Sequence, residues 1–168
     1  TLLSAEETSA LFPPLSSEYA SVHVSGAARV DGRALRDSLL RASQKNGAKL
    51  MYGEAALTYN GTQVSGVTLR DEFIPADKVI VCAGAWAPEL LKPLGVNFQV
   101  TFQKAQIIHL ETPNENTNNW PVVMPPSDQY LLAFDNNKIV AGATHENTEV
   151  FDNRMTAGGL QEVFNKAL

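Results

Sequence analysis

The spacing of hydrophobic residues along this chain predicts several short helices. A capping box opens the first of them, at residues 4–11. Apolar residues recur at helical spacing within residues 33–46, between Asp31 as an N-terminal cap and Gly47 as a C-terminal cap. A third helical segment is expected at residues 86–92.

Runs of alternating or β-branched residues predict strands between the helices. Asn60-Gly61 is a strong hairpin signal, and it separates the strands expected at residues 55–59 and 63–69. Further strands are expected at residues 20–25, 48–52, 73–75, 98–111, 121–124, 129–134 and 138–142. The pattern predicts an α/β to α+β fold, with a mixed sheet that has a large antiparallel part and flanking helices.

Residues 79–82, Val-Ile-Val-Cys, are apolar without alternation. Such a run is typical of a strand that is buried on both faces. The small residues 83–85 follow directly, and Trp86 begins the next helix. This order of strand, small-residue turn and helix start is where α/β proteins place a cofactor. On this interpretation Cys82 is a buried and unreactive thiol, not a nucleophile.

The last predicted helix follows Thr156, which is suited to cap it. Its apolar stripe continues to Leu168 with no Gly, Asn or Pro after it. At the other end, the chain begins at Thr1 without a methionine or a signal-like segment. We therefore expect both ends to be cuts within a longer chain.

Composition and charge narrow the class of protein. The 168 residues are 44% hydrophobic and 18% charged, which is typical of a folded domain, and we treat residues 1–168 as one unit. A net charge of −5 argues against nucleic acid or an anionic membrane as a partner. No apolar run approaches the roughly 20 residues of a membrane span. A single cysteine indicates a reducing compartment, and we expect a cytoplasmic protein.

Motifs for catalysis are absent from this sequence. It contains neither a Gly-rich phosphate-binding loop nor a nucleophile elbow, and its three histidines are too far apart to predict a metal site. We interpret His145 and Glu146 as a solvent-facing pair, with proton transfer as the alternative. Trp86 either covers a ligand or belongs to the core. Tyr130 either packs in the core with its hydroxyl satisfied or contacts a substrate.

Several stretches resemble one known family in their order and spacing. They are Arg29-Val-Asp-Gly, Ala34-Leu-Arg-Asp-Ser-Leu, Asn46-Gly-Ala-Lys, Val64-Ser-Gly-Val-Thr, Ile74-Pro-Ala-Asp-Lys-Val-Ile-Val-Cys-Ala-Gly-Ala-Trp-Ala, Lys104-Ala-Gln, Tyr130 and Val140-Ala-Gly-Ala-Thr-His-Glu. In this order the chain resembles the middle of the FAD-dependent D-amino-acid oxidase family, in its glycine oxidase and sarcosine oxidase branch. The resemblance covers nearly all of this chain but only an internal part of the family's length.

The resemblance implies a fragment of a two-domain FAD oxidoreductase that oxidises the C–N bond of a small amine or amino acid. Roughly residues 30–95 would belong in part to the FAD-binding domain, and residues 96–155 to the sheet of the substrate domain. Five residues would lie beside FAD: Ala56, Ala83, Gly84, Trp86 and Lys104. Tyr130 would lie near the substrate. No residue of the chain is assigned a catalytic or metal-binding role.

Two parts of the family pattern are missing from these 168 residues. They are the N-terminal Gly-rich βαβ unit that binds pyrophosphate and the C-terminal Gly-x-Arg-Pro segment whose arginine holds a substrate carboxylate. We therefore expect the chain alone to bind no FAD tightly and to be inactive, with Ala83, Gly84 and Trp86 exposed. The alternative is a stand-alone, non-catalytic binding or oligomerisation domain with the same fold.

Overall fold

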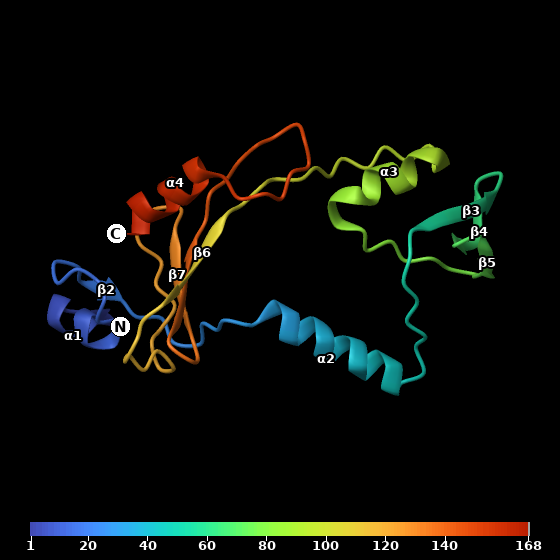
Figure 1. The fold of residues 1–168 in the computed structure, drawn as a ribbon. Coiled ribbons are helices and arrows are strands. Elements are labelled where there is room, and N and C mark those ends of the chain that lie inside the picture. The colour runs from blue at the N-terminus through green and yellow to red at the C-terminus, as the bar shows by residue number, and fades with distance from the viewer. Residues whose placement is uncertain (168) are drawn as a thin grey trace. The chain divides into compact units, whose positions relative to one another are not determined.

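A computed structural model describes residues 1–167, and the predicted uncapped helix end at Leu168 lies outside the described residues. The chain divides into two compact units (Figure 1). The first unit comprises Thr1–Asp31 and Gln103–Leu168, and the second comprises Gly32–Phe102. Helices and antiparallel sheets occur in both units, which confirms the predicted mixture of helix and antiparallel sheet.

The first unit is built on an antiparallel sheet of three strands. They are β6 (Ile107–Glu111), β7 (Tyr130–Phe134) and β8 (Lys138–Gly142), and β8 lies between the other two. Asn136 and Asn137 join β7 to β8 with φ angles of 63° and 61°. This left-handed conformation is one that asparagine tolerates, so the sequence specifies the tight turn locally.

Helix α4 (Ala157–Ala167) covers one face of this sheet (Figure 1). Thr156 caps it as predicted, because its hydroxyl oxygen accepts the Gly159 N–H at 3.1 Å. Val163 is fully buried and packs on Ile108 and Ala141. The helical apolar stripe is therefore buried by strands that lie before it in the sequence.

A second core cluster lies under the N-terminal segment. This segment contains β1 (Leu2–Leu3), α1 (Ala5–Leu11) and β2 (Ser21–Val22), with the predicted capping box at the start of α1. The ring of Phe12 packs against Trp120, with the ring centroids 5.1 Å apart. These two aromatic residues, together with Ala133 and Ile139, form the core on the same face of the sheet that α4 covers further along.

The second unit contains one long helix and a three-stranded meander. Its elements are α2 (Gly32–Lys45), β3 (Ala55–Asn60), β4 (Gln63–Leu69), β5 (Glu72–Pro75), η1 (Gly84–Trp86), α3 (Ala87–Leu91) and η2 (Lys92–Leu94). The hairpin predicted at Asn60-Gly61 is confirmed, with Gly61 at a φ of 61°. No residue of α2 is buried within the described part of the chain.

The strand predicted at residues 79–82 is wrong for this chain. The segment has no strand conformation, Ile80 is 87% exposed and Cys82 is also exposed. A strand needs a partner for its backbone N–H and C=O groups, and no strand among residues 1–167 pairs with this one. The interpretation of Cys82 as a buried thiol is wrong for the same reason.

Four other predicted strands form only in part or not at all. Of the strand predicted at residues 20–25, only Ser21–Val22 forms, as β2. Residues 48–52 have no strand conformation, and of residues 98–111 only the last five form β6. Residues 121–124 make a single bridge, between Val123 and Leu131. β-branched and aromatic composition favours these strands locally, but pairing decides whether they form.

Candidate functional site

Tyr130 lies on the face of the first unit's sheet opposite to α4. Strand residues alternate between faces, and its neighbour Leu131 packs on the α4 side. Tyr130 is paired with Gly142, which is paired in turn with Ile107. A Cβ on Gly142 would lie 2.7 Å from the Tyr130 hydroxyl oxygen and 2.7 Å from Ile107 Cγ2. The half-buried tyrosine ring therefore lies across the central strand, in space that the glycine leaves free.

The segment before β6 and the segment after β8 stay paired beyond the regular strands. The Lys104 N–H donates to the Glu146 carbonyl oxygen at 3.0 Å, and the Glu146 N–H donates to the Lys104 carbonyl oxygen at 2.8 Å. Between them, the Thr144 N–H donates to the carbonyl oxygen of Gln106 at 3.1 Å. The Lys104-Ala-Gln and Ala-Thr-His-Glu stretches are thus brought together side by side.

The buried Gln106 side chain connects these strand ends to α4. Its Nε2 donates to Glu146 Oε1 at 2.6 Å and to Thr156 Oγ1 at 2.9 Å. Its Oε1 accepts the Thr156 N–H at 2.8 Å. The Thr144 hydroxyl donates to the same Glu146 oxygen at 2.6 Å. We call these four residues, Gln106, Thr144, Glu146 and Thr156, the Gln106 network.

The Gln106 network lowers the pKa of Glu146 below its ordinary value of 4.5. The hydrogen bond from the Thr144 hydroxyl has the largest effect, followed by the bond from the Gln106 amide, while burial opposes both. Glu146 is therefore an ionised acceptor at neutral pH and not a proton donor. His145 is exposed, and its Nδ1 lies 3.4 Å from Gln103 Oε1. The solvent-facing interpretation is confirmed for His145, whereas Glu146 is half-buried and its Oε1 accepts hydrogen bonds from Gln106 and Thr144.

The small-residue turn of the second unit is open. Gly84 has a φ of +53°, and no atom lies within 4 Å of the position that a Cβ would take there. The predicted exposure is confirmed for Gly84 and for Trp86, which is 58% exposed, whereas Ala83 is half-buried. Trp86 is therefore not part of a core formed by the described residues. Ala56 is exposed on β3, where it is paired with Thr68.

The structure brings some of the predicted site residues together. Lys104 and Tyr130 both lie in the first unit, on either side of β8 and its continuation. The Lys104 ammonium group donates to the Arg154 carbonyl oxygen at 2.7 Å. The turn at residues 83–86 lies in the second unit, as does Ala56.

Sequence reasoning missed Gln106 and Thr144 as members of a buried network. Each of them is a polar residue inside a strand-like run, and this was the available signal. Gln106 lies two residues after Lys104, and Thr144 lies two residues before Glu146. A buried side chain of this kind must find partners, so such positions indicate a side-chain hydrogen bond across strands.

Among residues 1–167, no group of three or more His, Cys, Asp or Glu side chains is placed to hold a metal ion. Within the same residues, every helix is too short or too polar to cross a membrane.

Comparison with known proteins identifies the family. The family model of FAD dependent oxidoreductases (DAO) matches residues 1–168. The chain belongs to this family. Like the rest of the DAO family it is therefore related to FAD-dependent enzymes, as the resemblance in the sequence implies.

Relatives of this DAO-family chain share its fold and are longer. It is 59% identical over 169 residues to the uncharacterised oxidoreductase YurR of Bacillus subtilis (strain 168), a match that covers 100% of this chain and 45% of YurR. The crystal structure of iminodiacetate oxidase (IdaA) from Chelativorans sp. BNC1 is 44% identical, with a TM-score of 0.94 over 100% of this chain and 46% of that one. A glycine oxidase of Pseudomonas aeruginosa is 39% identical over 108 residues, covering 61% of this chain and 29% of the relative. The chain thus spans less than half the length of these relatives.

Proposed function

We propose that this chain is part of a longer FAD-dependent oxidoreductase that oxidises the C–N bond of a small amine or amino acid. The observation that carries the proposal is the similarity to iminodiacetate oxidase along the whole chain, at 44% identity and a TM-score of 0.94. Iminodiacetate is a small secondary amine that bears carboxylates, so a substrate of that class is the first to test. The protein is proposed to be cytoplasmic, which its single cysteine supports.

The residues at the open turn fit one wall of an FAD site. Gly84 leaves space for a flat ligand, and Trp86 presents more than half of its surface beside it. Ala83 and Ala56 would contribute backbone and small side chains that let a ligand approach closely. The chain has no Gly-rich phosphate-binding loop, so we expect these 168 residues alone to bind FAD only weakly.

Two stretches of the chain are proposed to serve different parts of the reaction. Roughly residues 30–95 would belong in part to the FAD-binding domain, and residues 96–155 would form the sheet of the substrate domain. When bound, FAD would accept the hydride that leaves the carbon next to the amine nitrogen, so that the neutral amine becomes an iminium ion. Tyr130 would contact the substrate from the sheet face opposite to α4, and Lys104 would lie beside the flavin.

Expression of this chain and of the longer protein in parallel tests the proposal. We expect the longer protein to be purified with a visible flavin spectrum and to oxidise iminodiacetate, sarcosine or glycine, whereas the 168-residue chain does neither. Oxygen consumption, compared with reduction of an artificial electron acceptor, separates an oxidase from a dehydrogenase. A longer protein without flavin would reject the proposal in favour of the non-catalytic binding domain.

A further inference from the structure

An extra residue interrupts the pairing between β6 and β8 in the first unit. Ile107 is paired with Gly142, and further along the same two segments Lys104 is paired with Glu146. Two residues lie between these pairs on the β6 side and three on the β8 side, so the β8 side carries one residue more. Such an extra residue is a β-bulge, a feature that is frequent next to active sites. We call it the Ala143 bulge, after the residue that follows Gly142.

Two buried side chains hold the Ala143 bulge in place. The Gln129 side chain belongs to a residue that is 3% exposed, and its Nε2 donates to the Ala143 carbonyl oxygen at 2.9 Å. The Thr144 hydroxyl oxygen accepts the Gln106 N–H at 2.9 Å, a bond that a regular ladder would make to a backbone carbonyl. Buried N–H and C=O groups need partners, so these two bonds supply what the interrupted ladder does not.

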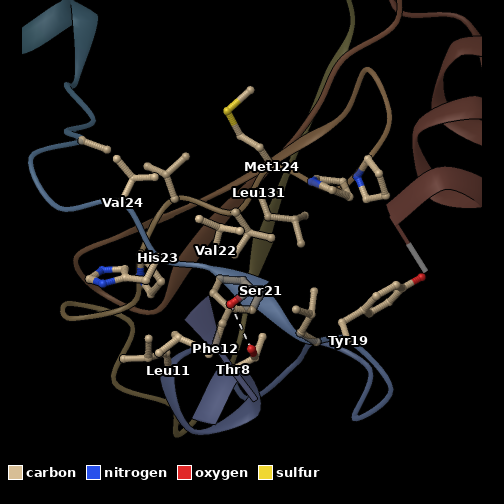
Figure 2. Close-up of a pocket in the computed structure, with 18 of the residues that line it drawn as sticks. Thr8, Leu11, Phe12, Tyr19, Ser21, Val22, His23, Val24, Met124 and Leu131 are labelled. Carbon is tan, nitrogen blue, oxygen red and sulfur yellow. Dashed lines mark hydrogen bonds between the residues drawn. The ribbon is translucent and has the colours of Figure 1, made fainter. Parts of the chain in front are cut away.

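Gln129 supports the bulge from the side of the sheet that faces away from Tyr130. It lines the apolar pocket of Figure 2 together with Leu131, and Tyr130 between them points to the opposite face. Because its amide is buried there, Gln129 acts on the face of Tyr130 only through the backbone of the bulge.

The bulge decides which side chains share a face with Tyr130. With the extra residue in place, Glu146 points to the side of α4, where it is half-buried in the Gln106 network. His145, one position earlier, is exposed on the opposite face. A shift of the pairing by one residue moves every side chain to the other face. Without the bulge, Glu146 would lie opposite Gln103, on the face of Tyr130.

A carboxylate on that face would work against the proposed substrates. The pKa of Glu146 is lowered, so its side chain is ionised at neutral pH. An ordinary exposed glutamate is ionised at that pH as well. A negative charge beside Tyr130 would therefore repel the carboxylate of an amino acid or of iminodiacetate. The bulge keeps this charge on the other side of the sheet.

We propose that Gln129 is a positioning residue that sets the charge preference of the substrate site. Its amide holds the Ala143 bulge, and the bulge keeps the Glu146 carboxylate away from the face of Tyr130. Gln129 itself touches no substrate atom. The inference rests on the proposed function, because it requires an amine that bears carboxylates to bind at that face.

Steady-state kinetics of the longer protein test the inference. Gln129→Met keeps the length of the side chain and removes its N–H donors. We expect the KM for iminodiacetate, which bears two carboxylates, to rise on the order of tenfold, since a hydrogen bond to a buried group is worth about that factor. The KM for sarcosine, which bears one carboxylate, should rise less, and kcat for both amines should change little. Added salt should narrow the difference between the two amines, because it screens the repulsion.

A control and a second substitution separate positioning from support of the fold. Gln161→Met, at an exposed position of α4, should change neither KM. The double variant Gln129→Met, Glu146→Gln should bring the KM for iminodiacetate back toward the unsubstituted value, because a neutral amide does not repel a carboxylate. A merely structural role predicts the reverse, since Glu146→Gln weakens the Gln106 network as well. Should Gln129→Met fail to fold, Thr144→Val removes the other bond at the bulge and must give the same difference between the two amines.

Hydrogen exchange of the longer protein reads the bulge without flavin or substrate. The Thr144 and Glu146 N–H groups donate across the bulge to Gln106 and Lys104, so their protection reports the register of the two segments. Exchange at residues 143–146 should be faster in Gln129→Met, on the order of tenfold or more, while exchange at residues 107–111 should not change.

Three outcomes would overturn the inference. They are unchanged exchange at residues 143–146 in Gln129→Met, a KM for iminodiacetate that rises no more than the KM for sarcosine, and a double variant no better than Gln129→Met. A longer protein that oxidises neither amine rejects the proposed function and this inference with it. Normal oxidation of the amines together with any of the three outcomes rejects this inference alone.

Discussion

The side-chain amide of Gln106 donates to Glu146 Oε1 at 2.6 Å, although the two residues lie 40 positions apart in the sequence. Through Thr156, the same amide also holds the start of α4. One buried side chain therefore links the end of the sheet to the helix that covers it. Because every member of such a network depends on the others, changes to it should affect the stability of the first unit.

Replacement of Glu146 by Gln should make the acid unfolding of the chain shallower. The pKa of Glu146 is lowered in the folded state, so its ionised form stabilises the fold above its ordinary value of 4.5. This contribution is lost as the pH falls from about 4.5 through the lower folded pKa. Urea midpoints measured from about pH 6 to about pH 3 should fall less steeply in Glu146→Gln than in the parent chain. The exposed Glu115→Gln is the control, and an equal change in both variants would contradict the prediction.

Two neighbouring glycines in α4 should respond in opposite directions to alanine. A Cβ on Gly159 would lie 2.0 Å from Gln106 Nε2, and that buried side chain cannot move without breaking the Gln106 network. We expect Gly159→Ala to cost about 1–3 kcal/mol in the free energy of unfolding. A Cβ on Gly158 meets nothing within 4 Å, so Gly158→Ala should stabilise the helix by about 0.5–1 kcal/mol. Urea denaturation of the two variants decides the matter, and destabilisation of similar size in both would be inconsistent with this packing.

Alanine at Gly142 should displace Tyr130. The added methyl group would occupy the space of the tyrosine ring and of Ile107, at a cost of about 1–3 kcal/mol. The near-ultraviolet circular dichroism of the chain should change with the ring's position. The Gly142→Ala, Tyr130→Ala double variant should lose less free energy of unfolding than the sum of the losses in the two single variants. The reason is that alanine at position 130 leaves space for the methyl group added at position 142. If the losses in free energy of unfolding were strictly additive, the Tyr130 ring would not lie against Gly142.

The two tryptophans should differ in their access to solvent. Trp86 is 58% exposed, whereas Trp120 is 8% exposed and packs against Phe12. Iodide should quench the fluorescence of the chain mainly through Trp86. The variant Trp86→Phe should therefore lose most of the quenchable signal, and Trp120→Phe should keep it. Equal quenching of the two single-tryptophan variants would contradict the exposure of the turn at residues 83–86.

Features that depend on a few adjacent residues were predictable from the sequence. The capping box at Ser4, the Asn60-Gly61 hairpin and the Thr156 cap all form as predicted. In each case the hydrogen bonds lie within a few residues, so their energies do not depend on the rest of the fold. The apolar stripe of α4 was predictable as well, because helical spacing alone assembles it.

Strands without partners show the limit of such reasoning. The apolar run at residues 79–82 meets every local criterion for a buried strand, and yet Ile80 is 87% exposed. Backbone pairing and burial are supplied by residues far away in the sequence, so composition cannot tell whether they are present. The same limit left Gln106 unassigned, because its burial and its bonds depend on Glu146 and Thr156.

The sequence by itself determined the local elements of this protein and, through motifs in a fixed order, its membership of the FAD-dependent oxidoreductase family. The tertiary structure alone decided which of those motifs meet. It places Lys104 opposite Glu146 and Tyr130 across Gly142, while the turn at residues 83–86 stays open to solvent. The physical reason is that caps and turns depend on hydrogen bonds between residues close in the sequence. Contacts between motifs depend instead on strand register and burial, which are properties of the whole fold.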